Sequence, residues 1–115
     1  MDLEKIKLKL RDFAEKRDWE QFHDPKNLSM ALSVEVAELV EIFQWSKSGG
    51  LDEINDPKKR KAIEREIADI FNYLVKLVDL LDMDLERASL DKIEENSKKY
   101  PVESSKGKSE KYNKL

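Results

Sequence analysis

Four carboxylates stand at helical spacing in two short motifs of this sequence. Glu35 and Glu38 lie in S-V-E-V-A-E-L-V-E-I-F-Q-W, and Glu66 and Asp69 lie in E-I-A-D. At about 100° per residue around an α-helix, the two members of each pair share one face. Glu35 and Glu66 fall at the centres of arcs that otherwise carry apolar side chains. We therefore expect two buried carboxylate pairs on two core helices.

Buried carboxylates need a positive partner, and neither arc carries a Lys or Arg at its centre. Oxygen ligands without thiolate or imidazole suit Mg²⁺, or Mn²⁺ in its place, better than Zn²⁺. Since Mg²⁺ keeps waters and binds substrate phosphates, a polyphosphate is the expected substrate class. The pattern thus predicts a Mg²⁺ site built from Glu35, Glu38, Glu66 and Asp69.

The same carboxylates are compatible with two alternatives to a Mg²⁺ site. A di-iron bundle would need a Glu-x-x-His on each of two helices, but the only histidine, His23, stands in an expected loop. Ion pairs with Lys or Arg from elsewhere in the chain are the second alternative. Glu41 lies about 60° beyond Glu38 around the helix. It is a further metal ligand, a residue that holds a metal ligand in place, or a solvated charge.

The elements that must position these residues are helical. Asp24-Pro25 and Asp56-Pro57 are typical helix starts, and no alternating pattern indicates a strand. Four helices with short links predict an all-α fold with a four-helix bundle-like protomer. The expected helices cover residues 3–17, 25 to between 45 and 48, 57–81 and 85–99.

Composition limits the possible functions. The 115 residues form one domain, expected over residues 1–101, with a polar, Lys-rich tail at 102–115. A net charge of −3 argues against a nucleic-acid partner, and the absence of Cys excludes disulfides and thiolate chemistry. The first residues alternate apolar and charged side chains, so we expect no signal peptide, no membrane span and a cytoplasmic location.

Longer stretches of the chain resemble a known family. The segments are R-D-W-E-Q-F-H-D-P-K-N-L, E-L-V-E-I-F-Q-W, D-I-F-N-Y-L, K-I-E-E-N-S-K-K-Y-P and S-E-K-Y. Together with the E-x-x-E and E-x-x-D motifs, they resemble the all-α nucleotide pyrophosphohydrolases of the MazG-like superfamily, and within it the dCTP pyrophosphatase branch. The resemblance covers nearly the whole chain.

This resemblance implies an enzyme for nucleotide-pool sanitation. The expected reaction is Mg²⁺-dependent hydrolysis of a (deoxy)nucleoside triphosphate, dCTP or a related pyrimidine dNTP, to the monophosphate and pyrophosphate. Water would attack the α-phosphorus, with Glu35, Glu38, Glu66 and Asp69 as catalytic metal ligands. The resemblance also implies a homotetramer, a dimer of dimers, in which a neighbour completes the base site. A non-catalytic nucleotide-sensing module and a structural helical protein are the alternatives.

The resemblance further implies a set of substrate-binding residues. Trp19 and Trp45 would flank the base, which suits stacking on a π-face. His23 either contacts the base or orders its loop. Leu10, three residues before Phe13, stands where cytosine-tuned members have His, which puts the preference for cytosine in question. The residues expected to contact the triphosphate are Tyr73, Lys92 and Asn96.

Overall fold

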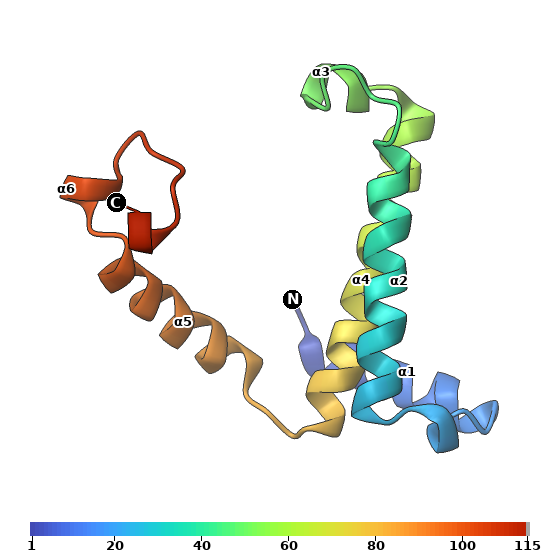
Figure 1. The fold of residues 1–115 in the computed structure, drawn as a ribbon. Coiled ribbons are helices and arrows are strands. Elements are labelled where there is room, and N and C mark those ends of the chain that lie inside the picture. The colour runs from blue at the N-terminus through green and yellow to red at the C-terminus, as the bar shows by residue number, and fades with distance from the viewer. Residues whose placement is uncertain (115) are drawn as a thin grey trace. The chain divides into compact units, whose positions relative to one another are not determined.

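The computed structural model describes residues 1–114, and in that range its regular elements are all helices, without a strand (Figure 1). This confirms the predicted all-α fold. None of the helices in this range is long and apolar enough to span a membrane. The elements in order are α1 (Leu3–Lys16), the 3₁₀ turn η1 (Glu20–Phe22), α2 (Pro25–Ile42), α3 (Leu51–Ile54), α4 (Pro57–Leu80), α5 (Leu85–Lys99), α6 (Val102–Ser105) and the 3₁₀ turn η2 (Tyr112–Lys114).

Aspartate caps set the starts of the longer helices. The Asp24 carboxylate accepts a hydrogen bond from the Asn27 amide at 2.7 Å, and that of Asp56 accepts one from the Lys59 amide at 3.2 Å. Proline follows both caps, at the first helical position, where no amide hydrogen is needed. Asp2 caps α1 and Asp84 caps α5 in the same way, so all four helices begin as the sequence predicts.

The end of α2 differs from the expectation. The helix ends at Ile42 rather than between Trp45 and Ser48, and the following turn leads into α3, a short helix that the sequence pattern did not predict. Glu53 of α3 accounts for the early stop, because its carboxylate accepts hydrogen bonds from the Ser46 hydroxyl and from the amides of Lys47 and Ser48. The chain therefore turns back before it reaches the glycines at 49 and 50.

The core lies between three helices of a compact unit that covers Met1–Asp82. α2 and α4 pack along their lengths, and α1 packs on α4 (Figure 1). Leu28, Val75 and Val78 are buried between them, and Ala14 closes the contact of α1. The Arg11 guanidinium also donates to the Asp79 carboxylate at 2.7 and 2.5 Å, which ties α1 to α4.

A second compact unit begins at Met83 and contains α5, α6 and η2. Within it, the rings of Tyr100 and Tyr112 meet edge to face at 6.2 Å, and the Lys99 ammonium lies 5.1 Å from the centre of the Tyr112 ring. The packed helices of the first unit number three, so the four-helix packing of the protomer stays a prediction, as does the domain boundary at residue 101.

Candidate active site

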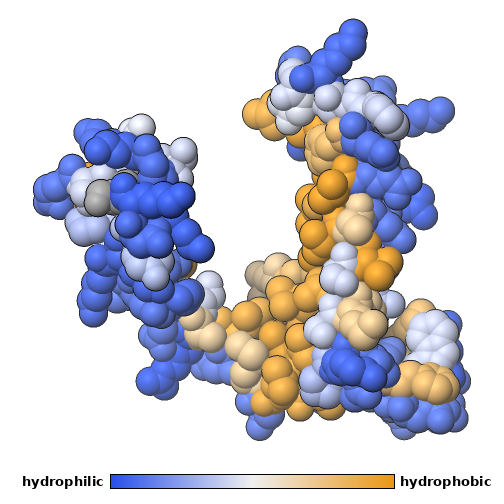
Figure 2. All heavy atoms as spheres, viewed as in Figure 1, coloured by the Kyte–Doolittle hydropathy of each residue, from blue (hydrophilic) through white to orange (hydrophobic). Residues whose placement is uncertain are grey.

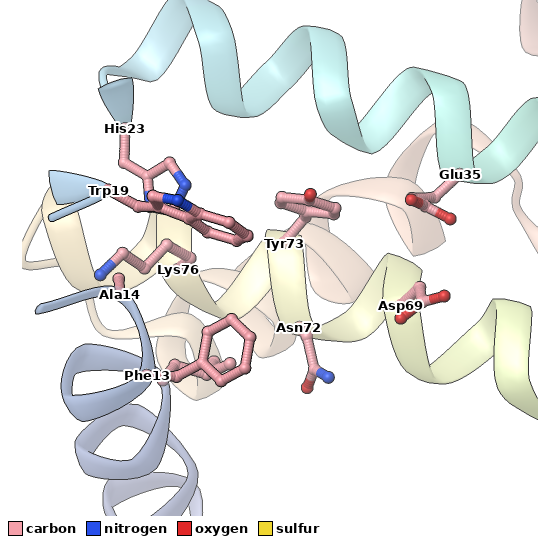
Figure 3. Close-up of a pocket in the computed structure, with 10 residues that line it drawn as sticks. Phe13, Ala14, Trp19, His23, Glu35, Asp69, Asn72, Tyr73 and Lys76 are labelled. Atoms are coloured by element: carbon pink, nitrogen blue, oxygen red, sulfur yellow. The ribbon is translucent and has the colours of Figure 1, made fainter. Parts of the chain in front are cut away.

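The packing of α2 against α4 brings the predicted carboxylates together. One carboxylate oxygen from each of Glu35, Glu38 and Glu66 lies within 4.8 Å of the others. Asp69 follows Glu66 by one turn of α4 and lines a pocket together with Glu35 (Figure 3). Two helices that are separated by 14 residues of chain thus present their carboxylates to one another.

Burial and mutual repulsion disfavour the charged forms of Glu35 and Glu66, so the pKa of each is raised. Burial, followed by the hydrogen bond and charge of Glu38, raises the pKa of Glu35 to about 7. The same two causes raise the pKa of Glu66. Glu38 and Asp69 are exposed in the single chain, so the expectation that both members of each pair are buried was wrong for these two. They lie at the rims of their helix faces, where α2 and α4 leave room for solvent.

The donor set fits a hard divalent cation. Glu35 Oε2 and Glu66 Oε2 are buried and accept no hydrogen bond from the described residues. Across residues 1–114, none of the four carboxylates has a Lys, Arg or His nitrogen within ion-pair distance. Since buried carboxylate oxygens without a partner are costly, this arrangement favours a cation over the ion-pair alternative.

A pocket of about 410 Å³ connects the carboxylates to an aromatic cluster. Glu35 and Asp69 stand at one end, and Trp19 and His23 stand at the other, with Tyr73 between them (Figure 3). The remaining lining residues come from α1 and α4: Leu10, Phe13, Ala14, Asn72 and Lys76. One end of this pocket is therefore acidic and the other is aromatic.

The indole of Trp19 is held by other rings at the aromatic end. Its ring centre lies 5.7 Å from that of Phe13 and 6.3 Å from that of His23, both edge to face. Trp19 is still 43 % exposed, so part of its face is available to a ligand. His23 Nδ1 is buried without a hydrogen-bond partner in the described part of the chain. Both predicted residues thus line the pocket, and the imidazole offers it an unused polar atom.

Trp45 lies away from this pocket. Trp45 is 85 % exposed and stands three residues after the end of α2, whereas Trp19 stands six residues before its start. The two tryptophans therefore flank opposite ends of the helix. The 18 residues of α2 span about 27 Å at 1.5 Å per residue. One chain therefore does not bring both tryptophans to the same ligand.

Lys92 and Asn96 occur one turn apart on α5, in the second unit. The Lys92 ammonium lies 3.2 Å from a carboxylate oxygen of Glu95, a helical neighbour. Their contact with the triphosphate stays a prediction. Glu41 is exposed on α2 and does not belong to the three-carboxylate group.

Two polar residues of the pocket were not predicted from the sequence. Both residues lie on α4, on the same face as Asp69. Asn72 is three residues after Asp69, and Lys76 is three residues after Tyr73. That spacing is a signal in the sequence, since residues three and four apart share a helix face. For Lys76 the residue type predicts the opposite, because a lysine at the edge of an apolar arc is ordinarily solvated.

Comparisons with known proteins identify the family of this chain. The model of the MazG-like family matches residues 30–115. dCTP pyrophosphatase 1 of Rattus norvegicus is 44 % identical over 114 residues, covering 98 % of this chain and 67 % of the relative. dCTP pyrophosphatase 1 of Homo sapiens is 41 % identical over 114 residues, with the same two coverages.

A solved structure shares both the fold and part of the sequence. The crystal structure of a pyrophosphatase from Archaeoglobus fulgidus superposes with a TM-score of 0.78 and 39 % identity, covering 88 % of this chain and 94 % of that one. The family match spans most of this chain, and the curated relatives match it almost from end to end. By these findings, the chain belongs to the MazG-like family.

Proposed function

We propose that this protein is a nucleoside triphosphate pyrophosphohydrolase that converts a pyrimidine deoxynucleoside triphosphate, with dCTP as the first candidate, to the monophosphate and pyrophosphate. The observation that carries the proposal is a single pocket with carboxylates at one end and aromatic rings at the other. Such a pocket matches the two halves of a nucleotide, a polyphosphate and a flat base. The names of the rat and human relatives support dCTP as the first substrate to test.

The carboxylates would act as metal ligands. Glu35, Glu38 and Glu66 offer three oxygens close enough for one ion, and Asp69 extends the set by one turn of α4. Mg²⁺, or Mn²⁺ in its place, would supply charge stabilisation to the transferring phosphoryl group and lower the pKa of water. The protein's own task is then to hold the α-phosphate in line with water, so no side-chain nucleophile is required.

The other end of the pocket would hold the base. Trp19 presents an indole face for stacking, and His23 Nδ1 is a polar atom without a partner in the described residues. Tyr73 lies between the two ends, where the sugar or the phosphates of a bound nucleotide would pass. By the family resemblance, Lys92 and Asn96 of α5 would contact the triphosphate.

Leu10 bears on the choice of base. It lines the pocket and offers the base no hydrogen bond, so His23 is the imidazole left at this end. Because base selection relies on placed polar groups, we expect this chain to accept thymine and uracil nucleotides beside dCTP. Substituting Leu10→His should raise the preference for dCTP over dTTP.

Assembly would complete the site. α2 exposes the apolar side chains of Met30, Val34, Val36 and Val40, and Figure 2 shows hydrophobic surface over α2 and α4. Exposed apolar surface of this kind marks an interaction site. A homotetramer built as a dimer of dimers would cover these residues and could bring Trp45 of one chain to the base end of another.

The test is a panel of canonical and modified dNTPs with Mg²⁺, scored for pyrophosphate and for the monophosphate, with EDTA as the metal-free control. The expected result is metal-dependent release of both products in equal amounts, fastest for pyrimidine deoxynucleotides. Binding of dNTPs without turnover would instead identify a sensing module. No binding and no turnover would identify a structural protein and contradict the proposal.

A further inference from the structure

Lys76 is a buried cation in the pocket that the proposed reaction does not use. It is 6 % exposed, and its ammonium lies 2.5 Å from a carboxylate oxygen of Glu20 in η1. The two residues are separated by 56 positions in the sequence, and the Glu20 side chain is 48 % exposed. The ion pair therefore joins the C-terminal part of α4 to the loop that carries Trp19.

The pair does not belong to the phosphate end of the pocket. Figure 3 shows the Lys76 ammonium at the end remote from Glu35 and Asp69, on the side of Trp19 and Ala14. With Glu20 at hydrogen-bond distance, the ammonium already has an anionic partner. A direct contact between Lys76 and the phosphates is thus excluded by this geometry.

The loop held by this pair carries the proposed base platform. Trp19 caps η1, its carbonyl accepts the Phe22 amide at 2.9 Å, and its own amide donates to the Ala14 carbonyl at 2.9 Å. These bonds connect the indole to α1 and to its own loop. The connection to α4, where Asp69 and Tyr73 stand, is made by Glu20, the residue that follows Trp19.

We propose that the Lys76–Glu20 ion pair is a positioning device that holds the Trp19 platform in register with the carboxylates of α4. This inference rests on the proposed function, because it assumes that one ligand reaches both ends of the pocket. A nucleotide that does so requires the two ends to keep a fixed separation, and small misplacements of a bound substrate are costly. Lys76 thereby determines affinity for the base without touching the reacting atoms.

The fold should tolerate loss of the Lys76 charge. An apolar replacement of similar volume for a buried ionic group is often neutral in stability, and Glu20 is exposed enough to be solvated once unpaired. We therefore expect Lys76→Met to fold, and we expect Glu20→Gln to fold because its amide oxygen can still accept a hydrogen bond from the Lys76 ammonium. Asp79→Asn is the matched control, because it breaks the other long-range pair, Arg11–Asp79, which joins α1 to α4 without involving η1.

Steady-state kinetics provide the first measurement. Lys76→Met and Glu20→Gln should raise the KM for dCTP by about three- to tenfold while kcat stays within about twofold. The reason is that binding of the base is weakened equally in the ground state and in the transition state. Lys76→Arg should restore the KM, because a guanidinium can also pair with Glu20. Asp79→Asn should leave the KM unchanged.

The second measurement does not depend on catalysis. In a Trp45→Phe background Trp19 is the sole tryptophan, so acrylamide quenching reports its exposure directly. Lys76→Met and Glu20→Gln should increase the quenching constant about twofold as the loop loosens, and Lys76→Arg should return it to the starting value. If the wild type hydrolyses no nucleotide, the proposed function fails, while this quenching comparison still decides the role of the pair. Quenching constants indistinguishable from those of Asp79→Asn would overturn the inference.

Discussion

The carboxylates of α2 and α4 interact with one another as individual residues. Glu38 is the leading charged neighbour of both Glu35 and Glu66, and it raises the pKa of each. Asp69 adds further negative charge to the same two groups. Without a cation, the cluster therefore destabilises the fold that brings it together, and each carboxylate can be tested separately for its part in metal binding.

Glu38→Gln and Asp69→Asn should each lower the rate of pyrophosphate release by about two decades or more, because each removes ligand charge at nearly constant volume. The measurement is product release at saturating Mg²⁺. Glu64→Gln, an exposed position two residues before Glu66 on α4, is the matched control and should keep wild-type activity. Wild-type rates in either site variant would contradict the metal assignment.

Calorimetry of Glu38→Gln and Asp69→Asn checks that the loss of activity is not caused by unfolding of the variant. In EDTA, Glu38→Gln should have a higher Tm than the wild type, since it relieves the repulsion on Glu35 and Glu66. Added Mg²⁺ should raise the Tm of the wild type more than that of the variant, because a ligand stabilises the state that binds it.

Trp19 should contribute to nucleotide affinity through stacking. Trp19→Ala is expected to weaken binding of a non-hydrolysable dCTP analogue by about one to two decades, corresponding to roughly 1 to 3 kcal/mol per stacked base. Titration calorimetry gives this number, and Mg²⁺ binding measured alone should not change. Phe22→Ala is the matched aromatic control, since Phe22 lies in the same loop but does not line the pocket. Equal losses in both variants would argue against stacking.

At the level of elements, the turn between α2 and α4 depends on one carboxylate. The Ser46 hydroxyl and the Ser48 amide, in that order, lower the pKa of Glu53 to about 2. Lys59 of α4 also lies 3.7 Å from this carboxylate. The network replaces the last turn of helix that the sequence predicts, and it leaves Trp45 on the outside of the turn.

This turn should open in acid. The folded pKa of Glu53 lies below its ordinary value of 4.5, so its stabilisation is complete above pH 4.5 and is lost as the pH falls toward 2. Amide hydrogen exchange at Lys47 and Ser48 should therefore lose protection over that interval, and Glu53→Gln should lose it already at neutral pH. Asp52→Asn, which removes only an acceptor for the Ser48 hydroxyl, should keep the protection at Lys47. Protection that is constant from pH 5 to pH 2 would contradict this account.

For the whole molecule, the exposed apolar residues of the first unit predict association. Met30, Val34, Val36 and Val40 are exposed on α2, and Trp45 is exposed three residues past its end. Figure 2 shows hydrophobic surface over α2 and α4. Exposed apolar surface of this kind marks an interaction site. A second copy of the chain is the occupant that would also bring Trp45 toward a base.

Light scattering should give a particle of about four chains of 13.5 kDa each, as the family resemblance implies. Val40→Lys should shift the particle toward smaller species and lower kcat/KM together, because a charge on this face opposes burial. Glu64→Lys adds the same side chain on a polar face of α4 and should leave the particle size unchanged. A monomer with full activity would contradict both the assembly and its role in the site.

Much of this protein was determined by local sequence. The Asp-Pro pairs begin α2 and α4 where predicted, because capping and the fixed φ of proline act within one turn of chain. Likewise the spacing of Glu35 with Glu38, and of Glu66 with Asp69, placed each pair on one helix face. Capping signals and periodicity therefore predicted the all-α fold and placed the four carboxylates as two pairs on two helices.

Tertiary structure decided what depends on contacts outside helical spacing. The Glu53 network follows the early end of α2, and the Glu20–Lys76 pair joins a loop to a helix 56 residues away. Neither contact leaves a periodic trace, because the Glu53 bonds form within an irregular turn and the Glu20–Lys76 pair is set by packing. The family resemblance implies that Trp19 and Trp45 flank one base, and the length of α2 separates them within a chain, so this base site stays a prediction that depends on a neighbouring chain.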